Sequence, residues 1–218
     1  MNKIRTIVFA LLVSIATTPL LAAGSDFAGP YFGIRASVNG AELDGSARNS
    51  NDEITDGHLG SVFGAVGGEF GYTLPMGDSP VFVSVGGTFI SGEATIIADA
   101  GEGNASGSED VTIHIQDHWS AYVAPGFAFS DTAAMYIKYG YAHADVDWQG
   151  DIQQGPKWIE GYTGAVGTRA MLPSGLFIQT EAGFTSYDDI HLTKKTGTGS
   201  AQADPMVAYG AVTLGMKF

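Results

Sequence analysis

The stretch that decides the fold reads Pro205-Met206-Val207-Ala208-Tyr209-Gly210-Ala211-Val212-Thr213-Leu214-Gly215-Met216-Lys217-Phe218. Counting back from Phe218 in steps of two gives Met216, Leu214, Val212 and Gly210, and the residues between them are mostly small or polar. Successive side chains of a β-strand point to opposite faces, so this segment has one apolar face and one mixed face. A strand with lipid on one side and a polar lumen on the other needs this alternation. We therefore predict a strand of a transmembrane β-barrel.

The other end of the chain predicts export. Lys3 and Arg5 precede an apolar run over residues 7–16, and small residues follow around Ala23. This is the pattern of a secretory signal peptide. The run is too short to cross the roughly 30 Å hydrocarbon core as a helix, and no later stretch approaches ~20 consecutive apolar residues. We expect a cleaved signal peptide at residues 1–23 and one barrel domain at residues 24–218.

Composition excludes several classes of function. The formal net charge of −13 argues against a nucleic-acid partner, which requires clustered Lys and Arg, and against attraction to an anionic lipid surface. The chain has no cysteine, so disulfides do not stabilise it in an oxidising compartment. Its 31 glycines recur within short alternating segments, which favours strands over helices.

Alternating segments predict eight strands, at about residues 29–43, 59–74, 81–97, 111–129, 134–148, 158–172, 176–192 and 205–218. Short connections at residues 75–80, 130–133 and 173–175 alternate with longer polar ones at 44–58, 98–110, 149–157 and 193–204. We therefore predict an all-β fold: an eight-stranded antiparallel up-and-down transmembrane β-barrel with short periplasmic turns and longer extracellular loops. A soluble barrel would show the same alternation with the faces inverted. The export signal, the terminal aromatic and the loop asymmetry favour the membrane barrel.

The alternation also assigns faces to the strands. In the strand at 111–129 one face carries Val111, Ile113, Ile115, Trp119, Val123, Phe127 and Phe129, and the other carries Thr112, His114, Gln116, His118, Ser120 and Tyr122. Aromatic residues near the strand ends predict girdles at the membrane interfaces. These residues are Tyr31, Phe129, Tyr139, Tyr141, Trp148, Trp158 and Tyr162.

The inward faces predict a set of charges in the lumen. The set is Arg35, Glu69, Lys138, Arg169, Glu181 and Lys217, accompanied by His114, Gln116, His118 and Gln179. An eight-stranded barrel is only just wide enough for its side chains to fill, and unpaired buried charge is expensive. Our hypothesis is that Glu69 and Glu181 pair with Arg35, Lys138 or Arg169 and plug the lumen. The alternative is that these charges line a thin water channel.

Four segments resemble the small eight-stranded outer-membrane proteins, the OmpA-like barrel family, and in particular its α-proteobacterial surface-antigen members. They are Phe27-Ala28-Gly29-Pro30-Tyr31-Phe32-Gly33-Ile34, Tyr139-Gly140-Tyr141-Ala142-His143-Ala144-Asp145-Val146-Asp147, Glu181-Ala182-Gly183-Phe184-Thr185-Ser186-Tyr187-Asp188-Asp189 and Gly210 to Phe218. The resemblance covers residues 24–218, although Thr168 on the expected lipid face is less typical.

The resemblance implies a role in envelope structure, adhesion or immune exposure more often than catalysis. It also implies that a terminal aromatic with alternating apolar residues is the signal read by the outer-membrane assembly machinery. The residues that match this signal are Val212, Leu214, Met216 and Phe218.

One local pattern bears on catalysis. His118 and Ser120 lie two residues apart on one strand face, as the His–Ser pair of outer-membrane lipid A deacylases does. Both share the parity predicted to face the lumen rather than lipid, so we interpret them as polar filling of the interior and expect no enzyme. The sequence shows no serine-hydrolase elbow, zinc-ligand spacing or phosphate loop, and we expect no catalytic site, metal or cofactor.

Two predicted loops are acidic. The first holds Asp44, Asp52, Glu53 and Asp56, and the second holds Asp99, Glu102, Glu109 and Asp110. Their carboxylates suit Ca²⁺, or Mg²⁺ bridging to lipopolysaccharide phosphates, but the spacing is not that of an EF-hand, and a solvated acidic loop is the simpler interpretation. Such loops are also where contact with a host or environmental ligand is expected.

Together these observations favour a non-enzymatic outer-membrane protein of a Gram-negative bacterium that supports envelope integrity and presents surface loops for adhesion. The alternative is a narrow porin-like channel for ions or small solutes. Outer-membrane lipid and lipopolysaccharide, the assembly machinery and a surface ligand are the expected partners, and no nucleic acid is expected.

Overall fold

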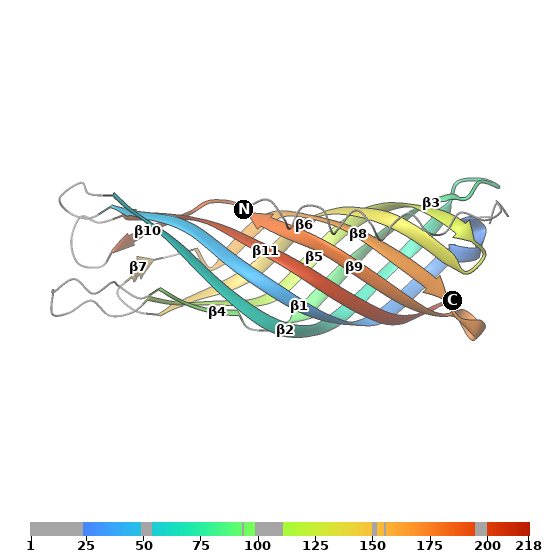
Figure 1. The fold of residues 1–218 in the computed structure, drawn as a ribbon, viewed down its shortest axis with the longest axis horizontal. Coiled ribbons are helices and arrows are strands. Elements are labelled where there is room, and N and C mark those ends of the chain that lie inside the picture. The colour runs from blue at the N-terminus through green and yellow to red at the C-terminus, as the bar shows by residue number, and fades with distance from the viewer. Residues whose placement is uncertain are drawn as a thin grey trace, which may run out of the picture.

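The structure, a computed structural model, describes residues 24–48, 54–92, 94–98, 111–149, 152–154, 156–194 and 200–218 (Figure 1). The predicted signal peptide at residues 1–23 lies outside them. The short helices are η1 (Gly24–Phe27) and η2 (Pro173–Gly175). The strands are β1 (Gly29–Arg48), β2 (Ile54–Pro75), β3 (Val81–Ser91), β4 (Ala94–Ala98), β5 (Val111–Ser130), β6 (Ala133–Gln149), β7 (Ile152–Gln154), β8 (Trp158–Met171), β9 (Leu176–Tyr187), β10 (Ile190–Lys194) and β11 (Ser200–Lys217). No described helix is long and apolar enough to cross a membrane.

The strands form a closed antiparallel barrel. The order is β1-β2-β3-β5-β6-β8-β9-β11, and β11 pairs back onto β1 from Tyr31↔Lys217 to Arg48↔Ser200. β4 follows β3 and pairs with β5, whereas β10 follows β9 and pairs with β11. β7 precedes β8 and pairs with β10. The wall therefore has eight strands, with three of them interrupted, and the predicted fold class is confirmed.

The connections differ at the two ends of the barrel. Residues 76–80, 131–132 and 172–175 make tight connections at one end, which we call the turn end. The opposite ends of the strands, such as the C-terminal end of β1 and the N-terminal end of β2, lie toward the left of Figure 1, and we call this the loop end. Both Gly24 and Phe218 lie at the turn end, where Gly24 N donates to Ser79 O and Phe218 N donates to Pro30 O.

The strands are longer at the loop end than the sequence suggested. β1 and β2 pair without interruption from Gly29↔Thr73 to Arg48↔Ile54, so residues 44–48 and 54–58 are strand and not loop. β11 likewise begins at Ser200 rather than at 205. In these extensions polar and small residues interrupt the apolar alternation of the sequence. The backbone ladder continues nevertheless, because sheet hydrogen bonds do not depend on side-chain polarity. A strand needs about 9–11 residues to span a bilayer, so the wall extends well beyond that span.

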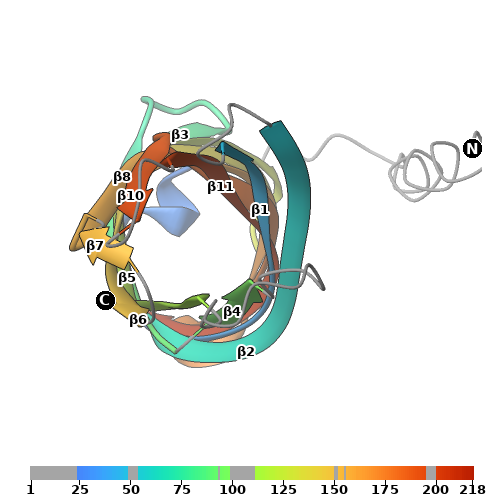
Figure 2. The same ribbon diagram turned by 90° about the vertical axis from the view of Figure 1, so that its left-hand side faces the viewer.

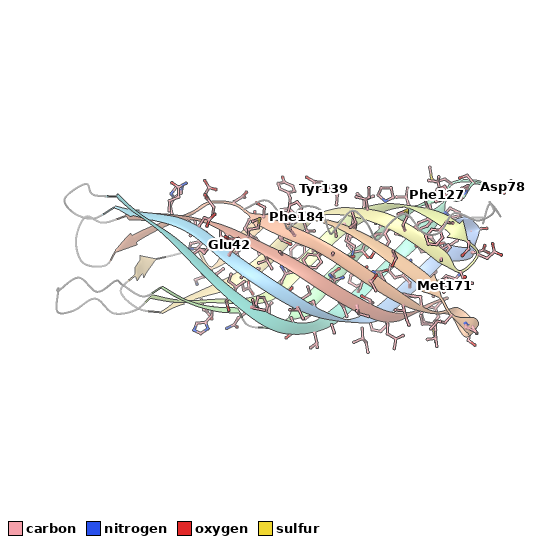
Figure 3. The ribbon with its side chains drawn as sticks, in the orientation of Figure 1. Glu42, Asp78, Phe127, Tyr139, Met171 and Phe184 are labelled. Atoms are coloured by element: carbon pink, nitrogen blue, oxygen red, sulfur yellow. The ribbon has the colours of Figure 1, made fainter. Side chains whose placement is uncertain are left out.

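The two halves of the barrel have opposite polarity. In the turn-end half the outward side chains are apolar and exposed, for example Ile34, Val66 and Phe127. In the loop-end half the outward side chains become acidic: Glu42, Asp44, Asp145, Asp147, Asp188 and Asp204. Figure 3 shows the transition, with Glu42 toward the loop end, Tyr139 near the middle and Phe127 toward the turn end.

An aromatic band marks the transition on the outside of the wall. Tyr139 stacks on Tyr162 at a centroid distance of 6.0 Å, and Trp119 stacks on His143 at 5.2 Å. The predicted girdle residues Phe129, Tyr139, Trp158 and Tyr162 are exposed on the outer face and Tyr141 is partly so. Tyr31 is a correction, because its side chain points into the lumen and is buried. The side chain of Trp148 lies outside the described part of the chain.

A bulge in β5 overturns part of the predicted face assignment. The pairing of β5 with β6 shifts register between Gln116 and Trp119, and Asp117 adopts a φ of 45°. One extra residue inverts the faces beyond it. Ile115 consequently lies inside the barrel, buried against Val146 and Ile159, although it was predicted to share a face with Trp119. His114 pairs with the outward residue Asp147, so its expected place among the lumen charges is wrong. Gln116 pairs with Asp145 at the bulge and still lines the cavity in the lumen.

Apolar side chains fill the lumen at both ends. At the turn end, η1 folds into the mouth of the barrel (Figure 2). There Phe27 stacks on Phe82 at a centroid distance of 5.5 Å, beside Ala128 and Ala134. At the loop end a larger cluster forms from Ala41, Leu43, Ile115, Ala142, Ala144, Val146, Ile159, Tyr187, Ile190 and Ala203. A soluble β-barrel buries apolar residues in the same way. The charged lumen predicted from the sequence therefore occupies only the middle of the barrel.

Among the described residues the ladder of the wall is interrupted between β2 and β4, and no ladder pair joins β6 to β7. β2 pairs with β3 only from Val66↔Ser91 to Pro75↔Phe82, and no ladder pair joins Ile54–Ala65 of β2 to β4. Among the described residues β4 therefore forms a hydrogen-bonding ladder only with β5, from Ala94↔Ile115 to Ala98↔Val111. This stretch lies farther toward the loop end than Trp119 and the aromatic band.

Close packing inside the barrel predicts a difference between two glycines of β8. A Cβ at Gly167 would overlap the Tyr136 ring and lie 2.7 Å from the Thr180 carbonyl oxygen, whereas a Cβ at Gly164 would make ordinary contact, 3.7 Å from the Phe184 ring. We expect Gly167→Ala to lower the free energy of unfolding by about 1–3 kcal/mol through overpacking, and Gly164→Ala to leave it nearly unchanged. Urea unfolding of the refolded protein in detergent micelles measures both. Equal stabilities of the two variants would contradict the packing described for the lumen.

Candidate functional site

The middle of the lumen holds a network of ionised side chains. Five charged residues converge there, and their exposed fractions are between 1% and 6%. They are Arg35 of β1, Glu69 of β2, Lys138 of β6, Arg169 of β8 and Glu181 of β9. The network exists only because antiparallel closure brings these strands around one axis, since Arg35 and Glu181 are 146 positions apart in sequence.

Glu69 is surrounded by donors. Its Oε1 accepts from the Tyr122 hydroxyl at 2.6 Å and from Lys138 Nζ at 3.2 Å. Its Oε2 accepts from Gln179 Nε2 at 2.9 Å and from the Thr213 hydroxyl at 3.4 Å. A buried carboxylate is tolerated when its lone pairs are matched in this way.

Glu181 occupies a similar position on the opposite wall. Arg35 Nη2 donates to its Oε1 at 2.8 Å, and Lys138 Nζ pairs with its Oε2. Two hydroxyl groups complete its surroundings, from Tyr136 at 2.9 Å and Tyr209 at 3.0 Å. Lys138 thus bridges both carboxylates and is the shared cation of the network.

Arg169 lies at the turn-end side of the network and makes no ion pair with another described residue. Its Nε donates to Gln179 Oε1 at 3.0 Å, and Gln179 in turn donates to Glu69. Its guanidinium lies over the rings of Tyr31 at 4.3 Å and Phe177 at 4.9 Å. Its Nη1 also donates to the Thr73 hydroxyl at 3.4 Å. Cation–π contacts, one amide and one hydroxyl therefore replace the ion pair that the sequence suggested.

Arg35 is the residue whose hydrogen bonding is incomplete. Its Nη2 is used by Glu181, and its Nη1 lies 3.7 Å from Glu69 Oε2, which is too long for a hydrogen bond. Nε and Nη1 are buried and lack a hydrogen-bond partner among the described residues. Unused buried donors of a charged group carry a cost of about 1–3 kcal/mol or more, so they favour any acceptor that reaches them.

A cavity lies directly toward the loop end from this network. Its volume is about 50 Å³, and Arg35, Lys138 and Glu181 line its floor. The other side of the cavity is formed by the apolar loop-end cluster. Two members of the cluster, Ile115 and Tyr187, line it together with Val207, which packs against the cluster. The cavity therefore has charged side chains on its turn-end side and apolar side chains on its loop-end side.

The histidine and serine considered for catalysis both line this cavity. Ser120 is buried, and His118 Nδ1 lies 2.6 Å from the Tyr187 hydroxyl, with the two rings edge to face. In a nucleophile–base pair the histidine is oriented by an acidic group, whereas here a phenol takes that place. His118 and Ser120 both lie in the lumen, as the alternation of side chains along the strand predicted.

Other residues predicted for the lumen lie elsewhere. Lys217 is inward but sits at the turn end, where its Nζ donates to the Asp26 carbonyl oxygen at 2.7 Å. The acidic residues Asp44 and Asp56 belong to β1 and β2, and the remaining acidic loop residues lie outside the described part of the chain. The described residues contain no group of three or more His, Asp or Glu able to hold a metal ion.

Sequence reasoning placed Tyr122 on the polar face of its strand but included no tyrosine in the charge network. Tyr122, Tyr136 and Tyr209 each donate to one of the two carboxylates. Tyr122 and Tyr136 share strand parity with Ser120 and Lys138, so inward parity was the available signal. The four residues of the expected assembly signal, Val212, Leu214, Met216 and Phe218, are all exposed on the outer face of β11.

The outer apolar belt, the aromatic band and the closed antiparallel wall define a small outer-membrane β-barrel protein. The sequence profile of the "Outer membrane protein beta-barrel domain" family matches residues 8–215. The chain belongs to this family, which implies the outer membrane of a Gram-negative bacterium.

Three solved structures illustrate the likeness. The outer membrane protein OprG from Pseudomonas aeruginosa is 11% identical, with 88% of this chain and 97% of that chain covered and a TM-score of 0.49. Ail, the attachment invasion locus protein of Yersinia pestis, is 11% identical, with 82% and 97% covered and a TM-score of 0.34. The outer membrane protease OmpT from Escherichia coli is 9% identical, with 94% and 99% covered and a TM-score of 0.46. No curated protein sequence matches the chain significantly.

The bridging position of Lys138 predicts a large effect of its removal. Lys138→Met leaves Glu69 and Glu181 buried with one cation fewer, and breaking such a pair costs about 3–5 kcal/mol of unfolding free energy. Lys157→Met is the matched control, because the Lys157 side chain is exposed. Lys138→Met combined with Glu181→Gln should recover part of the loss. Urea unfolding followed by tryptophan fluorescence measures all three, and equal losses for the two lysines would refute the network's role in stability.

Proposed function

We propose that the protein is a non-enzymatic, non-conducting outer-membrane barrel that supports envelope integrity and presents its loop end for adhesion. The observation that carries this proposal is the burial of all five lumen charges, since charges lining a water-filled channel would be exposed to it. Buried charges that pair with one another or, for Arg169, with polar and aromatic side chains fill the lumen at their level and leave little room for an aqueous path.

Two further layers support closure. Phe27 and Phe82 block the turn end, and the apolar cluster around Leu43 and Ile115 blocks the loop end. Water and ions would have to cross all three layers, and apolar constrictions resist wetting.

The proposed partners follow from the surfaces of the barrel. The apolar belt faces outer-membrane lipid, and the acidic loop-end half projects among lipopolysaccharide headgroups. The exposed alternating face of β11, ending at Phe218, is the proposed signal for the outer-membrane assembly machinery. Residues 1–23 would direct export as a signal peptide. The loops would contact a host or surface ligand.

A narrow channel is the second candidate. The cavity beside Arg35 and the unused donors of that residue favour it, because they leave space and charge for a small solute in the lumen. A lipid-modifying enzyme is less supported, because His118 is oriented by Tyr187 and both His118 and Ser120 face the lumen rather than lipid.

Single-channel recording in a planar bilayer tests the closed barrel. We expect no discrete conductance steps from protein whose folded state is verified in the same preparation by heat-modifiable gel migration. Stable ohmic steps from the folded protein would contradict the proposal and favour the channel.

A deletion strain tests the envelope role. We expect loss of detergent resistance, restored by the full chain, with unchanged lipid A composition. A chain shortened within residues 99–110 should restore detergent resistance but not surface binding, which separates the barrel's role from that of the loop. Altered lipid A in the deletion strain would instead indicate an enzyme.

A further inference from the structure

The loop-end half of β2 is a sheet edge. Residues 54–65 pair with β1 along their whole length on one side. On the other side the ladder with β3 ends at Val66↔Ser91, and no described residue forms a ladder pair with residues 54–65 there. An edge strand presents a row of backbone N–H and C=O groups, which is a template for pairing with another chain.

The strands on the two sides of this edge diverge toward the loop end. Where the divergence begins, Gly92 packs against β2, since a Cβ at Gly92 would lie 2.8 Å from the Ala65 Cβ. Farther along, β4 follows β5. Figures 1 and 2 both show the N-terminal end of β2 lying away from β4. Within the described part of the chain, no strand therefore continues the sheet past this edge, and we call the place the β2 opening.

The inner side of the β2 opening is apolar. Phe63 of β2 is partly buried and packs against the loop-end cluster, to which Leu43 and Ile115 belong. The side chains of an added strand would alternate between the two faces of the sheet, so every second one would point toward this cluster. Apolar residues are favoured at these positions, because they bury their own surface and that of the cluster.

The outer surface beside the β2 opening is acidic. Glu42 and Asp44 of β1 are exposed on the outer face, and Glu42 pairs with Gly60 of β2, which has no side chain to cover it. Asp145 and Asp147 are exposed on the outer face of β6, beyond β4 and β5. Charge complementarity therefore favours Lys or Arg at the outward positions of an added strand.

The same charges argue against a second copy of this chain at the edge. Two β2 edges paired with each other would bring Glu42 and Asp44 of both copies toward one interface. Like charges on neighbouring strands are destabilising, whereas opposite charges across strands are favourable. The acidic surface therefore selects a partner of positive charge.

We propose that residues 54–65 of β2 bind an extended segment of another protein by strand addition, and that this segment alternates apolar and basic residues. Main-chain hydrogen bonds supply the affinity, and the apolar cluster and the outer carboxylates select the side chains. The inference deepens the proposed adhesive role by naming a kind of partner, and it rests on that role for its setting outside the cell. The edge lies beyond the aromatic band, so the segment approaches from water.

Amide hydrogen exchange, followed by NMR on the refolded protein in detergent micelles, tests the proposal with an alternating Val–Lys decapeptide as the probe. In the free protein, the amides of residues 54–65 that donate to β1 exchange slowly, and those at the alternate positions exchange fast. Peptide at about ten times its Kd should slow exchange at the alternate positions by about tenfold, because the edge is then unoccupied about one tenth of the time.

Two control peptides separate alternation from charge. A block of five Val followed by five Lys has the same composition without alternation, and an alternating Val–Glu decapeptide has the opposite charge. Neither should produce the protection at alternate positions. Equal protection by the block peptide would overturn the proposal, because charge alone would then explain binding. Slow exchange of every amide of residues 54–65 without peptide would also overturn it, because the edge would then already be paired, within the chain or with a second copy.

A charge reversal on the outer surface tests the selection of basic residues. Glu42→Lys should weaken binding of the Val–Lys peptide by about three- to tenfold, as expected for exposed charge pairs. Asp188→Lys is the matched control, because Asp188 is equally exposed but follows β9, away from the β2 opening. Equal weakening by the two variants would contradict the proposed site.

This result is independent of the closed-barrel proposal. Neither the conductance recording nor the test of detergent resistance involves the edge of β2. Failure of strand addition would therefore leave the closed barrel standing, and a conducting barrel would leave strand addition standing.

Discussion

The structure depends on the closure of the backbone hydrogen-bonding ladder between β1 and β11. In hydrocarbon, each unpaired backbone N–H or C=O costs several kcal/mol, so a sheet can cross only if it has no edge. The pairing from Tyr31↔Lys217 to Arg48↔Ser200 removes that edge along the whole length of both strands. Closure with eight strands also fixes the width of the lumen, and this width determines what the interior residues can do.

The narrow lumen forces its charges together. Glu69 and Glu181 lie close enough to share Lys138, and three tyrosines and two polar side chains complete their surroundings. Such a network is stable only when nearly every donor and acceptor is matched. Arg35 departs from this rule, because its Nε and Nη1 are buried without a hydrogen-bond partner among the described residues. Its Nη1 lies 3.7 Å from Glu69, so the charge attraction within the network is what holds this side chain in place.

The barrel is a membrane protein in one half and resembles a soluble one in the other. Toward the turn end, apolar residues such as Ile34 face outward and polar ones such as Glu69 face inward. Toward the loop end, Asp44 and Asp145 face outward while Leu43 and Val146 are buried inside. The backbone ladder is indifferent to this inversion, so the strands continue past the aromatic band. A cavity with one charged and one apolar side arises where the two halves meet.

The sequence by itself determined the strand alternation, the strand number, the asymmetry of the connections and the inward placement of Arg35, Glu69, Lys138, Arg169 and Glu181. These are local properties, because side-chain direction has period 2 along any strand. Only the tertiary structure decided which charges meet, how far the strands extend and which face Ile115 occupies. Partners such as Arg35 and Glu181 are set by register around the closed barrel, and a single bulged residue at Asp117 inverts a face without a clear signal in composition. The cavity therefore depends on the register between strands that are distant in sequence and on the bulge in β5, and not on the alternation of side chains alone.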